Sequence, residues 1–197
     1  MYPTPGEPPV ERTRYSALDG VLDVPYNPAR TALMLQAEQL GIPHASGLSM
    51  LVAQAKKACE YFTGNPVPDA EIDRIERLLS RQMENIILIG MPGCGKNSVG
   101  KALAAALNRP FLDADEEIVR RAGCSIPEIF AALGEAGFRR LESAVLADLG
   151  KQSGIVLATG GGCVTRPENY PSLHQNGCIV WLTRDLSLLP TDGRPMS

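Results

Sequence analysis

A glycine-rich loop that ends in a lysine is the part of the sequence most able to do chemistry. Residues 88–103 read LIGMPGCGKNSVGKAL, and the pattern Gly-x-x-x-x-Gly-Lys is complete at Gly90, Gly95 and Lys96. Glycines allow backbone N–H groups to turn inward onto phosphate oxygens, and the following helix adds the partial positive charge of its N-terminus. We expect Lys96 to reach the outer phosphates of a nucleotide. The full motif between a buried strand and a helix disfavours a chance structural turn.

The residue after Lys96 departs from the usual pattern. A Ser or Thr hydroxyl normally binds Mg²⁺ at this position, and this chain has Asn97 there. Mg²⁺ takes hard oxygen ligands and keeps several waters. We therefore expect Asn97 to give a weakened but usable metal site, either directly through its amide oxygen or through a water. Ser98 is a poor substitute because it projects about 100° away on a helix.

Two aspartates follow the predicted strand "PFLDAD", residues 110–115. Asp113 and Asp115 lie at its C-terminal end, which is the ligand-binding edge of an open parallel sheet. Their side chains would share a face if the strand ran through both. One could then organise Mg²⁺ while the other accepts the proton of a substrate hydroxyl, as phosphoryl transfer requires. Alone, such a motif is more often a solvated strand end or a helix cap.

The segment "GFRRLE" offers a guanidinium for an anionic ligand. Arg139 and Arg140 project about 100° apart on a helix, so only one of them can face a given site. A planar guanidinium suits a small carboxylate through two parallel hydrogen bonds. Glu142 lies three residues beyond Arg139, close enough to orient it. A surface ion pair is the simpler interpretation of this segment.

Two further segments could approach a ligand. The run Gly160, Gly161 and Gly162 directly follows a predicted strand, where it allows close backbone approach or simply makes a tight turn. The polar loop "TDGRPMS" carries Arg194, which could close over a transferring phosphate or remain a solvated loop residue.

The elements that must position these residues alternate between strand and helix. We expect strands over 85–90, 110–115, 154–158 and 178–182, and helices over 98–107, 116–122, 127–133 and 135–149, with a short helix near Glu168. This order predicts a parallel sheet covered on both faces. Before it, a strand over 21–24 and three helices, the third capped by Asp69, predict a separate mostly helical region. We place the boundary near Gln82.

Composition sets the broad class. The 197 residues include 44% hydrophobic side chains, carry a net charge of −3, and contain five cysteines. These values are typical of a globular protein, disfavour a nucleic-acid partner, and indicate reduced thiols in a cytoplasmic protein. No apolar run approaches the length of a membrane span, so we expect no membrane association.

These motifs, in this order, resemble shikimate kinase. The resemblance covers residues 85–197 and rests on "GMPGCGKNSVGKALA", "FLDADEEI", "SIPEIF", "GFRRLE", "LATGGG" and "GRP" together. It implies a P-loop kinase with a three-layer α/β/α parallel sheet. It also implies ATP- and Mg²⁺-dependent phosphorylation of shikimate to 3-phosphoshikimate, in chorismate and aromatic amino-acid biosynthesis. We expect this kinase portion to be monomeric.

The resemblance also assigns roles to individual residues. The phosphates of ATP would be bound by Gly93, Cys94, Gly95, Lys96, Asn97 and Ser98, with Arg194 reaching ATP from a lid. Magnesium would be held by Asn97 and Asp113. Shikimate would be bound by Asp115, Arg139, Phe130, Phe138, Gly160, Gly161 and Gly162. Lys96, Asp115 and Arg194 would be catalytic, with Asp115 as the base and Arg139 on the substrate carboxylate.

The front of the chain is similar to a different family. "MYP", "VLDVPYNPARTALMLQAEQLGIP" and "GLSMLVAQAKKACEYFTG" resemble the C-terminal part of shikimate dehydrogenase, in which residues matching Tyr26 and Gln54 lie near the substrate. The catalytic Lys/Asp pair and the dinucleotide loop of that family are absent. We therefore expect residues 1–64 to be a dehydrogenase fragment without dehydrogenase activity, 65–84 a helical linker, and 85–197 a kinase domain truncated after its lid. Such truncation would expose apolar surface and weaken nucleotide affinity.

Two other functions fit the same residues. The chain could be a kinase for another small polar metabolite, in which case a substrate without a carboxylate would leave Arg139 without a partner. It could also be a catalytically weak fragment that binds nucleotide without turning it over. Asn97 and the expected truncation favour this alternative, and it is opposed by Lys96, Asp113, Asp115, Arg139 and Arg194.

Overall fold

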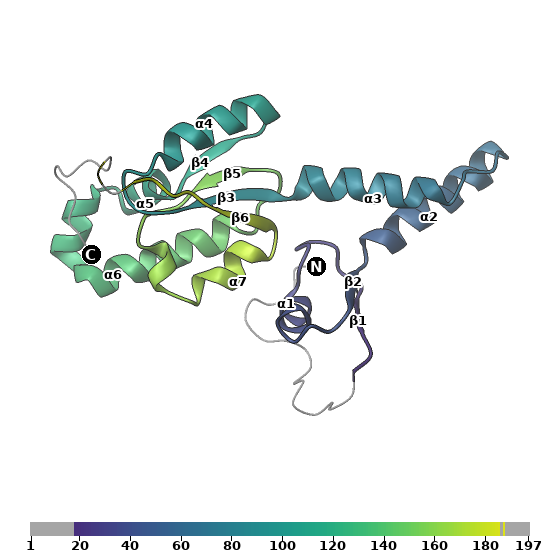
Figure 1. The fold of residues 1–197 in the computed structure, drawn as a ribbon, viewed down its shortest axis with the longest axis horizontal. Coiled ribbons are helices and arrows are strands. Elements are labelled where there is room, and N and C mark those ends of the chain that lie inside the picture. The colour runs from purple at the N-terminus through teal and green to yellow at the C-terminus, as the bar shows by residue number, and fades with distance from the viewer. Residues whose placement is uncertain (1–17, 186, 188–197) are drawn as a thin grey trace. The chain divides into compact units, whose positions relative to one another are not determined.

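The computed structural model describes residues 18–185 and 187, so "MYP" and Arg194 lie outside the described residues. The chain divides into two compact units, Met1–Met83 and Glu84–Ser197, which we describe separately (Figure 1). No helix in the described part of the chain is long and apolar enough to cross a membrane.

The first unit combines a small parallel sheet with three helices. Strands β1 (Val21–Asp23) and β2 (His44–Ser46) pair in parallel and are connected through α1 (Ala32–Gln39). Thr31 caps α1, because its hydroxyl accepts the N–H of Met34 and donates to the Asp23 carboxylate. Helices α2 (Leu48–Thr63) and α3 (Ala70–Met83) follow.

Helix α2 is buried only near its N-terminus. Leu48 and Val52 are buried, whereas Phe62 is 90% exposed. Gly64 ends the helix in the left-handed conformation that glycine adopts without strain, with a φ of 69°. Helix α3 has no buried residue among its 14 positions, so neither α3 nor the second half of α2 contributes to a core.

The second unit is built on a parallel sheet with the strand order β4-β5-β3-β6. Its strands are β3 (Asn85–Ile89), β4 (Phe111–Asp113), β5 (Val156–Ala158) and β6 (Gly177–Trp181). Its helices are α4 (Lys96–Leu107), α5 (Ala114–Ala122), α6 (Ile126–Leu149) and α7 (Asn169–His174), with a short 3₁₀ helix, η2, at Cys163–Thr165. The predicted α/β architecture with a parallel sheet is confirmed.

Helices cover both faces of this sheet (Figure 1). Alternate residues of β3 point to opposite faces: Ile87 packs into the larger core with α5, α6 and α7, whereas Leu88 packs with Ala104 of α4. Helix α4 lies close to the sheet because Gly100 has no side chain. A Cβ at Gly100 would lie 2.4 Å from the Phe111 ring.

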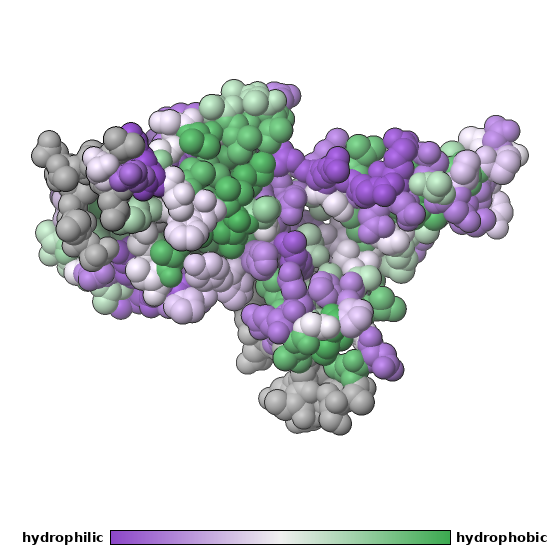
Figure 2. Space-filling view, viewed as in Figure 1, coloured by the Kyte–Doolittle hydropathy of each residue, from purple (hydrophilic) through white to green (hydrophobic). Residues whose placement is uncertain are grey.

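Apolar side chains also lie on the outer surface of the second unit. Figure 2 shows them gathered over α4 and the strands beside it. Val99 and Leu107 of α4 are 43% and 44% exposed, and Trp181 of β6 is 71% exposed.

Three local expectations differ from the structure. Helix α4 begins at Lys96, two residues earlier than expected, and α6 is a single element interrupted at Gly134, where φ is 65°. Strand β4 ends at Asp113, so Asp115 lies in the first turn of α5 and the expected shared strand face was wrong. The physical reason is helix capping: the Asp113 carboxylate accepts the N–H of Asp115 at 2.8 Å.

An ion-pair network holds α5 against the end of α6. Glu117 accepts hydrogen bonds from both Arg120 and Arg121, and Arg121 also pairs with Asp148 at 2.7 Å. The Arg120 hydrogen bonds, followed by that of Arg121, lower the pKa of Glu117 from 4.5 to about 2. A carboxyl group with a lowered folded pKa stabilises the fold above its unfolded pKa, and this contribution is lost as the pH falls through the folded pKa.

We predict that Glu117→Gln lowers the free energy of unfolding by about 1 kcal/mol at pH 7, because the arginines are partly exposed and screened. The difference from the parent chain should shrink as the pH falls from about 4.5 towards 2. Urea unfolding followed by circular dichroism at several pH values measures it. Glu116→Gln removes the same charge from an exposed neighbour and is the matched control. A difference that stays constant with pH would contradict the role of Glu117 ionisation.

Candidate active site

The glycine-rich loop between β3 and α4 has the conformation expected of an anion-binding loop. Gly90, Gly93 and Gly95 all have positive φ, at 148°, 79° and 101°. No side chain caps the N-terminus of α4, so the N–H groups of its first turn are available to an anion. Lys96 is 7% exposed, and its Nζ donates to the carbonyl oxygens of Gly90 at 2.7 Å and Met91 at 3.0 Å. The Lys96 ammonium group is therefore bonded to the backbone of the loop itself.

Asn97 and Asp113 lie beside this loop and are hydrogen-bonded to each other. Asn97 Nδ2 donates to Asp113 Oδ2, while Asp113 Oδ1 accepts from the Asp115 N–H. A carboxylate only accepts, so the amide nitrogen must face Asp113 and the amide oxygen must face away. Among the described residues that oxygen has no hydrogen-bond partner.

These two side chains fit a hard cation that keeps most of its own shell. The described residues contain no cluster of three or more His, Cys, Asp or Glu that could hold a metal. A free amide oxygen on Asn97 and the remaining lone pairs of Asp113 supply two oxygens beside the loop. Mg²⁺ is bound by proteins in this way, through one or two side chains with waters and substrate phosphates.

The glycine run after β5 brings three elements together. A Cβ on Gly160 would lie 2.7 Å from Glu142 Oε1 and 2.9 Å from Asp115 Oδ1. A Cβ on Gly162 would lie 2.3 Å from the terminal nitrogens of Arg139, and one on Gly161 would lie 2.5 Å from Pro92 of the glycine-rich loop. The run therefore allows α5, α6 and the loop to converge where a side chain would obstruct them.

Arg139 forms a buried ion pair, so the simpler interpretation of a surface pair was wrong. Arg139 Nη1 donates to Glu142 Oε2 at 3.0 Å, and the side chains are 11% and 1% exposed. Arg140 is exposed, as expected for the other side of the helix. Arg139 Nε and Glu142 Oε1 make no hydrogen bond within the described residues. Arg139 Nε also forms an ion pair with Glu135 Oε1 at 3.7 Å. Buried polar atoms usually have hydrogen-bond partners, so Glu142 Oε1 indicates a place for a polar ligand or water.

An aromatic pair stands beside this ion pair. The rings of Phe130 and Phe138 stack with centroids 4.4 Å apart, and the Arg139 guanidinium lies 5.4 Å from the Phe138 centroid. The site thus combines an apolar wall with charged groups, an arrangement typical of small-molecule sites.

The sequence analysis did not identify the residues that connect the glycine run to β3 through hydrogen bonds. Thr159 donates through Oγ1 to the Leu88 carbonyl at 3.0 Å and accepts from Cys163 Sγ at 3.1 Å. Asn169 Nδ2 donates to the Cys163 carbonyl at 2.8 Å. Burial raises the pKa of the Cys163 thiol. Polar residues flanking a glycine run were the available signal, but their burial depends on the tertiary fold.

Most of the residues singled out in the sequence lie in this one region. The structure brings together Gly93, Cys94, Gly95, Lys96, Asn97, Ser98, Asp113, Asp115, Phe130, Phe138, Arg139, Gly160, Gly161 and Gly162 on the loops and helix starts that follow β3, β4 and β5 and on α6. Arg194 lies outside the described residues.

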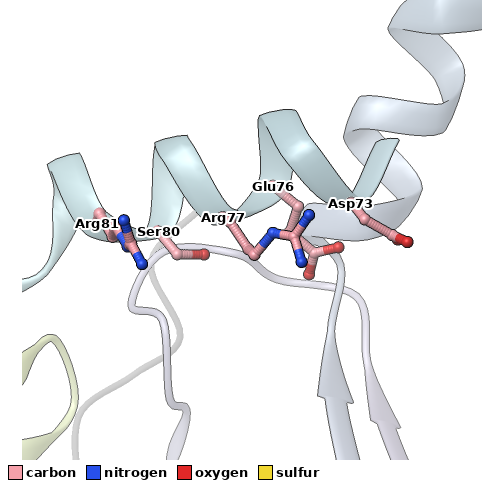
Figure 3. A pocket seen from close by; sticks show the side chains of 5 residues that line it. All are labelled: Asp73, Glu76, Arg77, Ser80 and Arg81. Atoms are coloured by element: carbon pink, nitrogen blue, oxygen red, sulfur yellow. The ribbon is translucent and has the colours of Figure 1, made fainter. Parts of the chain in front are cut away.

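A shallow depression in the first unit has a different character. Its volume is about 340 Å³, and Figure 3 shows its five side chains along α3: Asp73, Glu76, Arg77, Ser80 and Arg81. All five come from one helix and mix both charges. This is the pattern of a solvated helix face.

Comparison with known sequences identifies relatives of the second unit. The family model described as shikimate kinase matches residues 92–191. A shikimate kinase from Burkholderia pseudomallei (strain 1710b) is 51% identical over 98 residues, which cover 50% of this chain and 53% of that protein. One from Thioalkalivibrio sulfidiphilus is 54% identical over 101 residues, covering 51% and 53% respectively. The chain thus spans about half the length of these relatives.

Comparison with solved structures gives the same family. The shikimate kinase from Acinetobacter baumannii, solved in complex with shikimate, is 44% identical with a TM-score of 0.54, covering 56% of this chain and 62% of that one. The enzyme from Aquifex aeolicus is 38% identical with a TM-score of 0.52, covering 56% and 67%. Since the family model matches more than half of its residues, the chain belongs to the shikimate kinase family.

Proposed function

We propose that the second unit transfers the γ-phosphoryl group of ATP to a hydroxyl of shikimate, giving 3-phosphoshikimate for chorismate and aromatic amino-acid biosynthesis. The observation that carries this proposal is the convergence of Asp115 and Arg139 on the glycine run beside the phosphate loop. The relative solved with shikimate supports the choice of substrate. We further propose that this unit acts as a monomer in the cytoplasm.

Each residue has a role set by its chemistry. Asp115 accepts the proton of the attacking hydroxyl, and Arg139, held by Glu142, pairs with the substrate carboxylate. Lys96 exchanges its two backbone carbonyl partners for the outer phosphates of ATP, which also take the free N–H groups at the start of α4. Gly93 and Cys94 shape the glycine-rich loop. Phe130 and Phe138 line one side of the substrate site. Arg194 is proposed as the lid residue that reaches ATP.

The metal part of the proposal is Mg²⁺ held through Asn97 and Asp113. Bound there, the ion would neutralise charge on the phosphates. Asn97 offers its amide oxygen, and Asp113 offers the lone pairs not used by Asn97 and Asp115.

The alternative of another small polar metabolite is less well supported. The Arg139 guanidinium lies 3.0 Å from Glu142 Oε2 and 3.7 Å from Glu135 Oε1, and its remaining N–H donors still need acceptors. A substrate with a carboxylate meets this need, whereas a neutral sugar or alcohol does not.

Asp115→Asn should abolish most phosphoryl transfer without weakening nucleotide binding. Loss of a general base lowers kcat by a factor of about 10²–10⁴. A coupled assay of ADP formation with and without shikimate measures turnover, and titration with a fluorescent ATP analogue measures nucleotide affinity. Glu116→Gln, one residue along on the exposed side of α5, is the control. ADP formation by the parent chain that does not depend on shikimate would contradict the proposed reaction and favour a nucleotide-binding fragment.

Arg139→Ala should raise the KM for shikimate far more than the KM for ATP. Removing a charged partner of a bound carboxylate costs about 2–5 kcal/mol, which is at least a thirtyfold loss of affinity. Gly162→Ala should act in the same direction, because its Cβ would occupy the place of the guanidinium. Arg140→Ala, adjacent but exposed, is the matched control. If Arg139→Ala raised the KM for shikimate and the KM for ATP equally, Arg139 would not be the residue that binds the substrate carboxylate.

For the first unit we propose a shikimate dehydrogenase-like region, residues 1–64, followed by a helical linker over 65–84. Tyr26 is 43% exposed and Gln54 is also exposed, so neither lies in a closed substrate pocket of the described residues. We predict no dehydrogenase activity. The measurement is NADPH oxidation with 3-dehydroshikimate, and a rate above that of the heat-inactivated chain would show the prediction wrong.

A further inference from the structure

The side chain of Asn97 connects the starts of two helices that carry different parts of the site. Asn97 is the second residue of α4, directly after Lys96, while Asp115 is in the first turn of α5. We propose that Asn97 is a positioning residue: through Asp113 it fixes Asp115 to the phosphate loop before any metal or nucleotide binds. The significance of Asp115 in this inference rests on the proposed function.

Asp113 is the centre of the connection. It is 8% exposed, and each carboxylate oxygen has its own donor: Asn97 Nδ2 from α4 on Oδ2, and the backbone N–H of Asp115 from α5 on Oδ1. The Asp113 side chain cannot rotate without losing one of these bonds. Because the second bond caps α5, holding Asp113 also holds the first turn of that helix.

The connection continues from the backbone of Asp115 to its carboxylate. Asp115 Oδ1 lies 2.9 Å from the position that a Cβ on Gly160 would take, next to Glu142 Oε1. A shift of the α5 start would therefore move the proposed base relative to the glycine run and to Arg139. Misplacement of a catalytic group by about 1 Å can cost about a hundredfold in rate.

Asparagine is suited to this role because it is both a donor and an acceptor. Its nitrogen provides a neutral N–H partner for Asp113, where a carboxylate at the same position would repel it. A serine side chain is shorter, so its oxygen would lie farther from Asp113 than Asn97 Nδ2 does and would make a weaker contact. The free amide oxygen of Asn97 can still face a cation, so positioning and metal binding use different atoms of one side chain.

The test is hydrogen exchange at the Asp115 amide, measured by NMR on the metal-free, nucleotide-free full chain. Asn97→Ala should accelerate that exchange about tenfold, since it removes a hydrogen bond to a charged group that keeps the cap in place. Asn97→Asp should also accelerate it without metal, because two carboxylates then face each other. Millimolar Mg²⁺ should restore slow exchange in Asn97→Asp but leave the parent chain and Asn97→Ala unchanged. Val99→Ala, an exposed change two residues along α4, is the control and should have no effect.

Two results would overturn the inference. The first is an exchange rate of the Asp115 amide in Asn97→Ala that equals the rate in the parent chain. The second is an Asp115 amide in Asn97→Asp that exchanges slowly without Mg²⁺, or that still exchanges rapidly when Mg²⁺ is added. If Asn97→Ala does not fold, Asn97→Thr takes its place with the same expectation.

Calorimetric titration with shikimate in the absence of nucleotide separates this inference from the proposed function. Weaker shikimate binding by Asn97→Ala, with Val99→Ala unchanged, supports both. Accelerated Asp115 exchange in a chain whose parent form binds no shikimate supports the positioning role of Asn97 and rejects the proposed substrate.

Discussion

The site depends on β5 lying between β3 and β4 in a parallel sheet. Parallel strands end at the same edge, so this order places three connections side by side: the phosphate loop after β3, the start of α5 after β4, and the glycine run after β5. The register pairs Ile87 with Leu157, and beyond it the Thr159 N–H still bonds the Leu88 carbonyl at 3.1 Å. The pairing thus continues to the first residue before the glycines, which fixes where the run begins relative to Lys96.

The absence of side chains in the glycine run allows groups from neighbouring helices to approach its backbone closely. Side chains at Gly160 and Gly162 would occupy the positions of Asp115, Glu142 and Arg139. Without them, an anionic and a cationic group approach the same stretch of backbone from different helices. Burying the Arg139–Glu142 pair costs desolvation energy, and a pair of this kind is weak support for stability. Arg139 Nε lies 3.7 Å from Glu135 Oε1 without a hydrogen bond, and Glu142 Oε1 has no hydrogen-bond partner within the described residues. The unbonded Glu142 Oε1 is better explained by a ligand-binding role than by a packing role.

Sequence reasoning predicted the parallel sheet and the glycine-rich loop between a strand and a helix, because these follow from local patterns. The prediction failed where one residue suits two kinds of local structure. Asp113 is compatible both with the end of a strand and with a helix N-cap. In the structure it caps α5, so Asp115 belongs to α5 and not to a strand. The prediction also treated Glu142 as a surface residue, because spacing gives the pairing with Arg139 but not the burial. Burial depends on which strands are neighbours, and spacing along the chain does not determine that order.

The charge balance of the site explains why a neutral amide at position 97 is compatible with the fold. Asp113, Asp115 and Glu142 bring three carboxylates to one edge, opposed by Lys96 and Arg139. Lys96 is committed to backbone carbonyls and Arg139 to Glu142, so neither cation is bonded to Asp113. Within the described residues, the Asp113 carboxylate accepts hydrogen bonds from N–H groups, those of the Asn97 amide and of the Asp115 backbone. A neutral donor thus bonds this carboxylate, and Lys96 and Arg139 keep their positive charges for the phosphates and the carboxylate of the proposed substrates.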